Sequence, residues 1–132
     1  MIKSGIPRPT EGELEILKVL WEHGPSTVRE VHETLNHARP TGYTTVLKLL
    51  QIMTDKGIVV RNESQRAHVY EARMLREQTQ KQFLTDLLDR VFDGSPARLV
   101  MQALSSKKTS SAELAQIREL LDEIEKGAKK DA

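Results

Sequence analysis

The chain has 132 residues, of which 38% are hydrophobic and 4% aromatic, with no cysteine and a formal net charge of +1. A chain this short with so few large aromatic side chains predicts one or two small folding units, which often gain burial by oligomerising. The lack of cysteine excludes disulfides and thiolate metal sites. The sequence has no run of about eighteen apolar residues, so we predict no membrane span. Residues 1–9 lack the apolar core of a signal peptide, so we expect a soluble cytoplasmic protein.

Charge is distributed unevenly although its net value is small. Residues 10–33 carry two basic and six acidic side chains, whereas residues 34–73 carry six basic and three acidic ones. This separation fits a surface in the second segment that faces phosphates. Ordinary solvated faces give a similar pattern, so charge alone leaves both interpretations open.

The first predicted elements are an arm and a helix. Residues 2–9 contain one glycine and two prolines and are typical of a flexible arm. Thr10 and Glu13 then have the spacing of a capping box, in which each side chain bonds the backbone N–H of the other. Apolar residues at helical spacing follow, and Gly24 with Pro25 ends this helix.

Two further helices are predicted before residue 57. Thr27 and Glu30 form a second capping box and begin a short helix, which the residues around Pro40 interrupt. A third helix is predicted over residues 43–55. Its buried stripe consists of apolar residues at helical spacing, namely Val46, Leu49, Leu50 and Met53.

A β-hairpin is predicted after the third helix. Gly57 is a natural helix terminator, and residues 58–61 and 67–71 are typical of strands, with a polar loop over residues 62–66 between them. Three short helices followed by a hairpin is the element order of a winged helix-turn-helix head.

Only helices are predicted beyond residue 73. One runs from about residue 76 to 92, a shorter one follows Ser95 and Pro96, and a third begins with a capping-box pattern at residues 110–113. Residues 127–132 are expected to fray. We therefore predict a mainly α chain with an α+β head: a winged helix-turn-helix DNA-binding domain at residues 1–74 and an all-helical dimerisation domain at residues 75–132.

Patterns that would indicate catalysis or a metal are missing. The sequence has no glycine-rich phosphate loop, no His-Glu-x-x-His pair and no serine flanked by glycines as in a nucleophile elbow. No two of the four histidines stand four residues apart, and there is no cysteine to supplement them. We expect no catalytic residue, no metal and no cofactor.

The third helix carries the predicted base contacts. In winged heads this helix enters the major groove, where exposed side chains meet base edges. The residues that lie largely off its apolar stripe are Thr44, Thr45, Lys48 and Gln51, and all of them can bond bases or phosphates. A solvated face is the alternative, but threonine is a mediocre helix former, and this face has no carboxylate before Asp55.

Phosphate contacts are predicted at the helix ends and the wing. These contacts are assigned to Arg39, Arg61 and Arg66, and Tyr43 and His68 are further predicted DNA-binding residues, of which Tyr43 could bind phosphate through its hydroxyl. Arg66 in the hairpin loop could reach backbone phosphate or the minor groove, and it could also serve as an edge charge against aggregation, which is compatible with either contact. The Tyr43 ring could instead pack against the start of its helix.

The apolar stripes beyond residue 82 predict a homodimer. One long and two short helices offer too little surface to bury these side chains within one chain, and a two-fold dimer is the commonest solution, although the tail could also fold back on the head. The predicted interface consists of Phe83, Leu84, Leu87, Leu88, Val91, Phe92, Leu99, Val100, Leu104, Leu114, Ile117 and Leu121.

Several sequence segments, in the same order along the chain, resemble the penicillinase-repressor family (BlaI/MecI/CopY type). These are residues 14–21, 26–32, 42–47, 56–57, 66–70 and 114–124, within a resemblance that covers about Thr10 to Lys126. The resemblance implies a cytoplasmic repressor that binds double-stranded DNA at a palindromic operator as a dimer. Members of this family commonly control β-lactam-resistance or copper-homeostasis genes.

Release mechanisms of the family do not carry over to this sequence. In the β-lactam branch a membrane sensor-protease signals, and the repressor is cut at an Asn-Phe bond in the helix matching residues 99–104; here that position is Gln102-Ala103. In the copper branch a cysteine-rich tail binds metal, and this chain has no cysteine. The sensor-protease therefore stays an implied partner, and the inducer and target genes stay open.

Two other function classes fit the sequence less well. A winged-helix adaptor that binds proteins without sequence-specific DNA binding is the alternative, and the net basic charge of residues 34–73 argues against it. A small helical enzyme would need polar groups converging within the tail helices, and the stripe over residues 83–92 has none.

Overall fold

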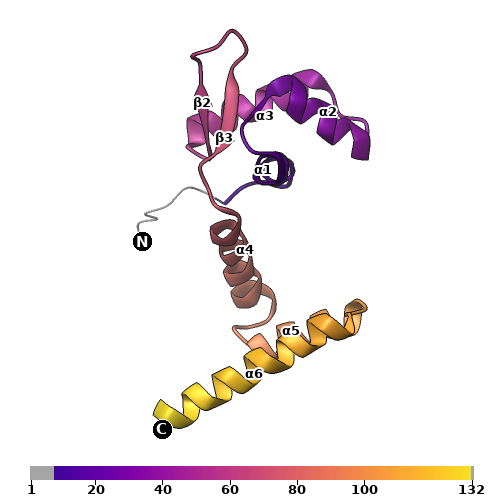
Figure 1. Ribbon diagram of the computed structural model, residues 1–132, viewed down its shortest axis with the longest axis vertical. Coiled ribbons are helices and arrows are strands. Elements are labelled where there is room, and N and C mark those ends of the chain that lie inside the picture. The colour runs from indigo at the N-terminus through magenta and orange to yellow at the C-terminus, as the bar shows by residue number, and fades with distance from the viewer. Residues whose placement is uncertain (1–7, 132) are drawn as a thin grey trace. The chain divides into compact units, whose positions relative to one another are not determined.

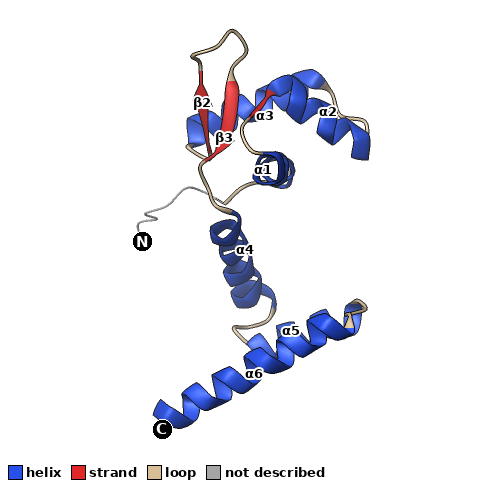
Figure 2. Ribbon diagram, in the orientation of Figure 1, coloured by secondary structure: helices blue, strands red, loops and turns tan. Residues whose placement is uncertain are grey.

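The computed structural model describes residues 8–131, with side chains up to residue 128. In chain order it contains α1 (Glu11–His23), β1 (Ser26–Thr27), α2 (Val28–Ala38), α3 (Tyr43–Lys56), β2 (Val59–Asn62), β3 (Val69–Ala72), α4 (Arg76–Val91), α5 (Pro96–Ser106) and α6 (Ser111–Asp131) (Figure 1). Helices predominate and the strands are confined to the first part of the chain (Figure 2). This confirms the predicted fold class.

Packing divides the chain after Asp86 into a head unit, which ends there, and a tail unit, which begins at Leu87. The first part of α4, residues 76–86, therefore groups with the three helices and the hairpin of the head. The division into functional domains at residues 74 and 75 stays a prediction.

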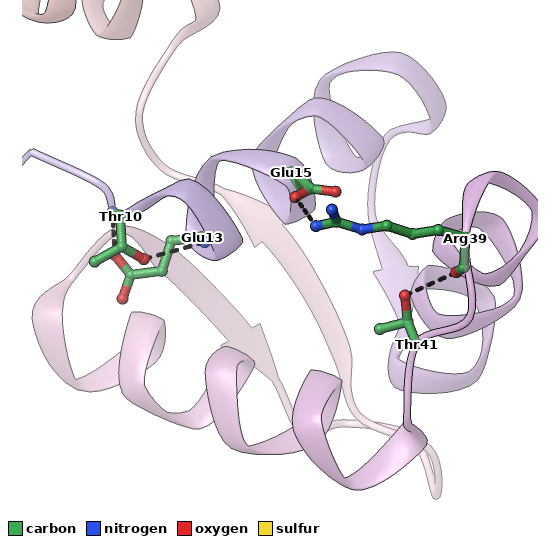
Figure 3. A network of polar contacts seen from close by, with 5 residues as sticks. All are labelled: Thr10, Glu13, Glu15, Arg39 and Thr41. Carbon is green, nitrogen blue, oxygen red and sulfur yellow. Dashed lines mark hydrogen bonds and ion pairs between the residues drawn. The ribbon is translucent and has the colours of Figure 1, made fainter.

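Capping boxes begin α1 and α2 as predicted. The hydroxyl of Thr10 accepts the N–H of Glu13 at 3.3 Å, while Oε1 of Glu13 accepts the N–H of Thr10 at 2.9 Å (Figure 3). Thr27 and Glu30 repeat this arrangement at 3.2 and 2.8 Å. Both helices thus begin where their own side chains satisfy the first free N–H groups.

The head has one hydrophobic core between its three helices and the hairpin. Its fully buried side chains come from every one of these elements and from Ile58, which follows α3; they are Ile16, Leu17, Val31, Val46, Leu50, Met53, Ile58, Val59 and Tyr70. The buried stripe predicted for α3 is confirmed at Val46, Leu50 and Met53, and Leu49 is partly buried against the core.

A three-stranded antiparallel sheet has the order β1-β3-β2. Arg61 of β2 pairs with Tyr70 of β3, and Ser26 of β1 pairs with the same tyrosine. β1 was not predicted, because two residues are too few to give a period. The predicted strand bounds were too early: Ile58 still bonds back to Met53 through its N–H at 2.9 Å, and β3 starts only at Val69.

In the tail unit, the α4 terminus, α5 and α6 follow the predicted order. Asp93 and Gly94 adopt positive φ angles of 51° and 76°, and the N–H of Gly94 returns to the carbonyl of Leu88 at 2.8 Å, which ends α4. The hydroxyl of Ser95 caps α5. We expected residues 127–132 to fray; α6 instead continues as a helix to Asp131, past Gly127, although glycine costs about 1 kcal/mol in a helix, and residue 132 lies outside the described part of the chain.

None of the helices among residues 8–131 combines the length and the apolar character that crossing a bilayer requires.

Candidate nucleic-acid interface

The side chains predicted to contact bases lie on the exposed face of α3. Thr44, Thr45, Lys48 and Gln51 are exposed, while Val46, Leu50 and Met53 on the opposite face are fully buried. α3 is thus anchored firmly through its core side and presents a polar face of hydroxyl, ammonium and amide groups. Asp55, four residues after Gln51, is the first carboxylate on that face and marks where it becomes unfavourable for a polyanion.

A tight turn sets the start of α3. The amide oxygen of Asn36 accepts the N–H of Thr41 at 3.0 Å, and Nε2 of His32 donates to the carbonyl of Thr41 at 2.7 Å. Gly42 is the N-cap and offers no side-chain cap to the first N–H groups of α3. Tyr43 is 48% exposed, and its ring meets that of His32 edge-on at 5.6 Å, so the ring packs against α2, and its contact with phosphate stays a prediction.

A groove joins the start of α3 to α2 and the wing. Its lining includes three side chains that the sequence predicted, Tyr43, Arg66 and His68. It also includes Arg29 and His32 of α2, which sequence reasoning missed. A signal for Arg29 existed: it lies in the first turn of α2, where a cation opposes the helix dipole, and an external anion would relieve that conflict.

Arg39 does not line the groove beside the wing. Its Nη2 donates to Oε2 of Glu15 on α1 at 2.5 Å, and its carbonyl accepts the hydroxyl of Thr41 at 3.0 Å (Figure 3). Arg39 lines a groove between α1 and α2 and not the one beside the wing. Its phosphate contact stays a prediction, and it would compete with an existing ion pair.

Arg61 is also paired within the head. Its Nε donates to Oε2 of Glu63 at 2.8 Å. The hydroxyl of Tyr70, and then the Glu63 carboxylate, raise the pKa of Arg61 further above its ordinary value. The hairpin loop is braced by the N–H of Ser64, which donates to the side chain of Asn62 at 2.9 Å. Arg66, in contrast, makes no ion pair with any residue in the described part of the chain.

The predicted dimer residues leave much apolar surface uncovered. No residue from 87 to 128 is buried. Leu88, Phe92, Leu99, Leu114 and Ile117 are half-buried, as is Phe83 at the end of the head unit. The exposed members are Leu84, Leu87, Val91, Val100, Leu104 and Leu121, and they are joined by three exposed residues that the prediction omitted, Met101, Leu120 and Ile124.

Comparisons with known sequences agree on one family. Residues 9–123 match the family model described as penicillinase repressor. The transcriptional regulator BlaI of Mycobacterium tuberculosis is 32% identical over 119 residues, which cover 88% of this chain and 86% of that protein. The penicillinase repressor of Bacillus licheniformis is 25% identical over 118 residues, which cover 89% and 92% of the two chains.

Comparisons with solved structures agree on the fold. The solution structure of the DNA-binding domain of the repressor BlaI matches with a TM-score of 0.51 and 25% identity, covering 58% of this chain and 93% of that one. A MarR family protein from Bacillus stearothermophilus matches with a TM-score of 0.50 and 16% identity, covering 93% and 77%. At that identity the second likeness concerns the fold alone. The winged-helix prediction for the head is confirmed.

Proposed function

Because the chain belongs to the penicillinase repressor family, we propose that it represses transcription as a homodimer bound to a palindromic operator. The coarser part of this statement follows from the family: the chain is a DNA-binding transcriptional repressor and not an enzyme. The dimer, the palindrome and the contact residues are the proposal. A cytoplasmic location, where the chromosome of a bacterial relative lies, is part of it.

The exposed face of α3 carries the proposal. Lys48 and Gln51 can donate to the N7 and O6 acceptors of guanine or the N7 of adenine, and the methyl groups of Thr44 and Thr45 can meet thymine methyl groups. A helix this well anchored by Val46 and Leu50 places those groups with little freedom, which favours discrimination between bases.

Phosphate binding is proposed for the groove beside the wing. Arg66 lies there without an ion pair among the described residues, and Arg29, Tyr43 and His68 line the same groove. Arg39 and Arg61 would first have to loosen their bonds to Glu15 and Glu63, so we assign them smaller contributions. The sequence prediction named Arg39, Arg61 and Arg66 together as phosphate contacts, and the ion pairs now separate Arg66 from the other two.

The homodimer is supported by the uncovered tail. Six of the predicted interface residues are exposed, and none between 87 and 128 is buried. Apolar side chains left exposed in this number usually mark an interface. A dimer would place two copies of α3 at half-sites about 34–36 Å apart, or a multiple of that distance.

Release from DNA in this protein must differ from release in the β-lactam branch of the family. Cutting at an Asn-Phe bond cannot occur at Gln102-Ala103, so a membrane sensor-protease, if it is the signalling partner, must recognise another bond. We propose β-lactam-resistance-like or stress genes as its targets.

The experiment that tests this proposal is selection of duplexes from a random pool by the purified full chain. We expect enrichment of a two-fold palindrome, with a footprint over both half-sites. Enrichment of a single half-site would remove the dimer from the proposal. No enriched sequence at all would favour a winged-helix adaptor over a sequence-specific repressor.

A further inference from the structure

The end of the N-terminal arm is attached to α4. The guanidinium of Arg8 forms an ion pair with the carboxylate of Asp86, and its Cζ stands over the ring of Phe83, 5.1 Å from the ring centroid. We expected residues 2–9 to be a flexible arm; residues 1–7 lie outside the described part of the chain, and at Arg8 the expectation was wrong. The Arg8 side chain thus contacts α4 at two residues, Phe83 and Asp86, which lie about one helical turn apart.

The start of α4 is attached to α1 as well. Nε1 of Trp21 donates to the carbonyl of Met74 at 2.8 Å, and the guanidinium of Arg76 stands over the Trp21 ring at 5.8 Å. Thr79 is 1% exposed, and its hydroxyl donates to the carbonyl of Leu75 at 3.1 Å. Residues 76–86 are therefore held near their beginning by α1 and near their end by the arm, all within the head unit.

We propose that Arg8 is a positioning residue for operator binding, which clamps α4 to the head and so sets the spacing of operator half-sites that the protein accepts. This inference rests on the proposed homodimer. α4 has 16 residues and is about 24 Å long, so a small rotation at its base becomes a large displacement at its far end. A clamp at Phe83 and Asp86, well along the helix, resists such a rotation far better than contacts at its first turn.

The clamp acts on geometry and not on base contacts. Arg8 lies on the opposite end of α1 from its junction with β1 and is absent from the groove beside the wing. Binding to one half-site needs one correctly folded head, whereas binding to two needs the heads at the right distance. Loss of Arg8 should therefore affect the two-site operator and spare the single half-site.

The test compares Arg8→Ala and Arg8→Lys with a control, Lys18→Ala, which removes an exposed positive charge from α1 in the same unit. Hydrogen exchange first measures whether amides of residues 80–86 lose protection. Binding is then measured on the selected palindrome, on a duplex with a single half-site, and on palindromes with one base pair added or removed between half-sites.

We expect the amides of residues 80–86 to exchange faster in Arg8→Ala than in the wild type. Binding to the palindrome should weaken about three- to tenfold, because the variant loses an exposed ion pair and a cation–π contact. Binding to the half-site should be unchanged, and the altered spacings should be penalised less than in the wild type. Arg8→Lys, which keeps the charge, should recover part of the effect, and Lys18→Ala should behave as wild type.

Two results would overturn the inference. Equal losses on the half-site and on the palindrome would make Arg8 a general contributor to folding or charge. An unchanged preference for spacing in Arg8→Ala would separate the clamp from operator geometry. Failure of the wild type to prefer a palindrome would instead contradict the proposed function, and the exchange measurement would still decide whether the clamp exists.

Discussion

Lys56, the last residue of α3, donates a hydrogen bond from Nζ to Oε2 of Glu13 in α1 at 2.9 Å. Glu13 is only 2% exposed, and its other oxygen accepts the N–H of Thr10. Burial alone would raise the pKa of Glu13, but the bond and charge of Lys56, with the N–H of Thr10, outweigh burial and hold this pKa below its ordinary value of 4.5. One carboxylate therefore caps α1 and ties it to α3, the helix that presents the predicted base contacts.

This pair predicts how stability depends on pH. Because the folded state favours the carboxylate, the stabilisation is fully present above about pH 4.5 and is lost as pH falls through the lower pKa of the folded state. Glu13→Gln keeps a capping oxygen but does not ionise in this range. Its free energy of unfolding, from urea titrations monitored by circular dichroism, should fall less steeply than that of the wild type between about pH 5 and about pH 3. Equal slopes would contradict the prediction.

Removing two basic side chains of the predicted interface should weaken DNA binding without affecting the fold. We expect Lys48→Ala combined with Arg66→Ala to lower operator affinity by about 10- to 100-fold. The slope of log affinity against log salt should become shallower by about 0.9 for each phosphate that the variant no longer neutralises. Lys107→Ala combined with Lys108→Ala removes two charges from the loop between α5 and α6 and should leave both quantities unchanged. An unaltered affinity and salt slope in the first variant would refute this contact assignment.

Arg29 should contribute to affinity and not to sequence preference. As a phosphate contact, its loss in Arg29→Ala should weaken binding to selected and scrambled duplexes by the same factor. Thermal unfolding should show no loss of stability, and a gain of about 0.3 kcal/mol is expected, because a cation leaves the N-terminal turn of α2. A weakening confined to the selected duplex would instead indicate that Arg29 contacts a base.

A charge on the apolar stripe of α6 should separate the protomers. Leu121 is 53% exposed and belongs to the predicted interface, so Leu121→Asp should shift the dimer toward monomer in sedimentation-velocity experiments. The affinity for the palindrome should fall because fewer dimers are present, while the affinity for a single half-site should not change. Ala115→Asp, on the polar side of the same helix, is the control. A dimer of unchanged affinity in Leu121→Asp would place the interface away from α6.

Local patterns predicted most of the fold. Thr10 with Glu13 and Thr27 with Glu30 fix two helix starts through bonds between residues three apart, and Gly57 ends α3 through its left-handed φ of 82°. Such features depend on neighbours in sequence, so the sequence alone predicts them. The two-residue strand β1 forms by pairing with β3, which is distant in the sequence, so no local pattern predicts β1.

The site was predictable only in part for a similar reason. The exposed face of α3 follows from its period, and the structure bears out that Thr44 and Lys48 are exposed. The pairing of Arg39 with Glu15 joins residues far apart in sequence, as does that of Arg8 with Asp86. Tertiary structure therefore decides that Arg39 and Arg8 are already paired, which the sequence pattern does not show.

α3 and the wing are proposed to bind DNA with sequence preference, and a salt series on the wild-type protein tests this proposal. Affinity for the selected palindrome and for a scrambled duplex of the same composition would be measured at rising salt concentrations. We predict preference for the palindrome at every concentration and a steep decline of both affinities with salt, as counterion release requires. Equal affinity for the two duplexes, or binding insensitive to salt, would show that α3 and the wing do not bind DNA in this way.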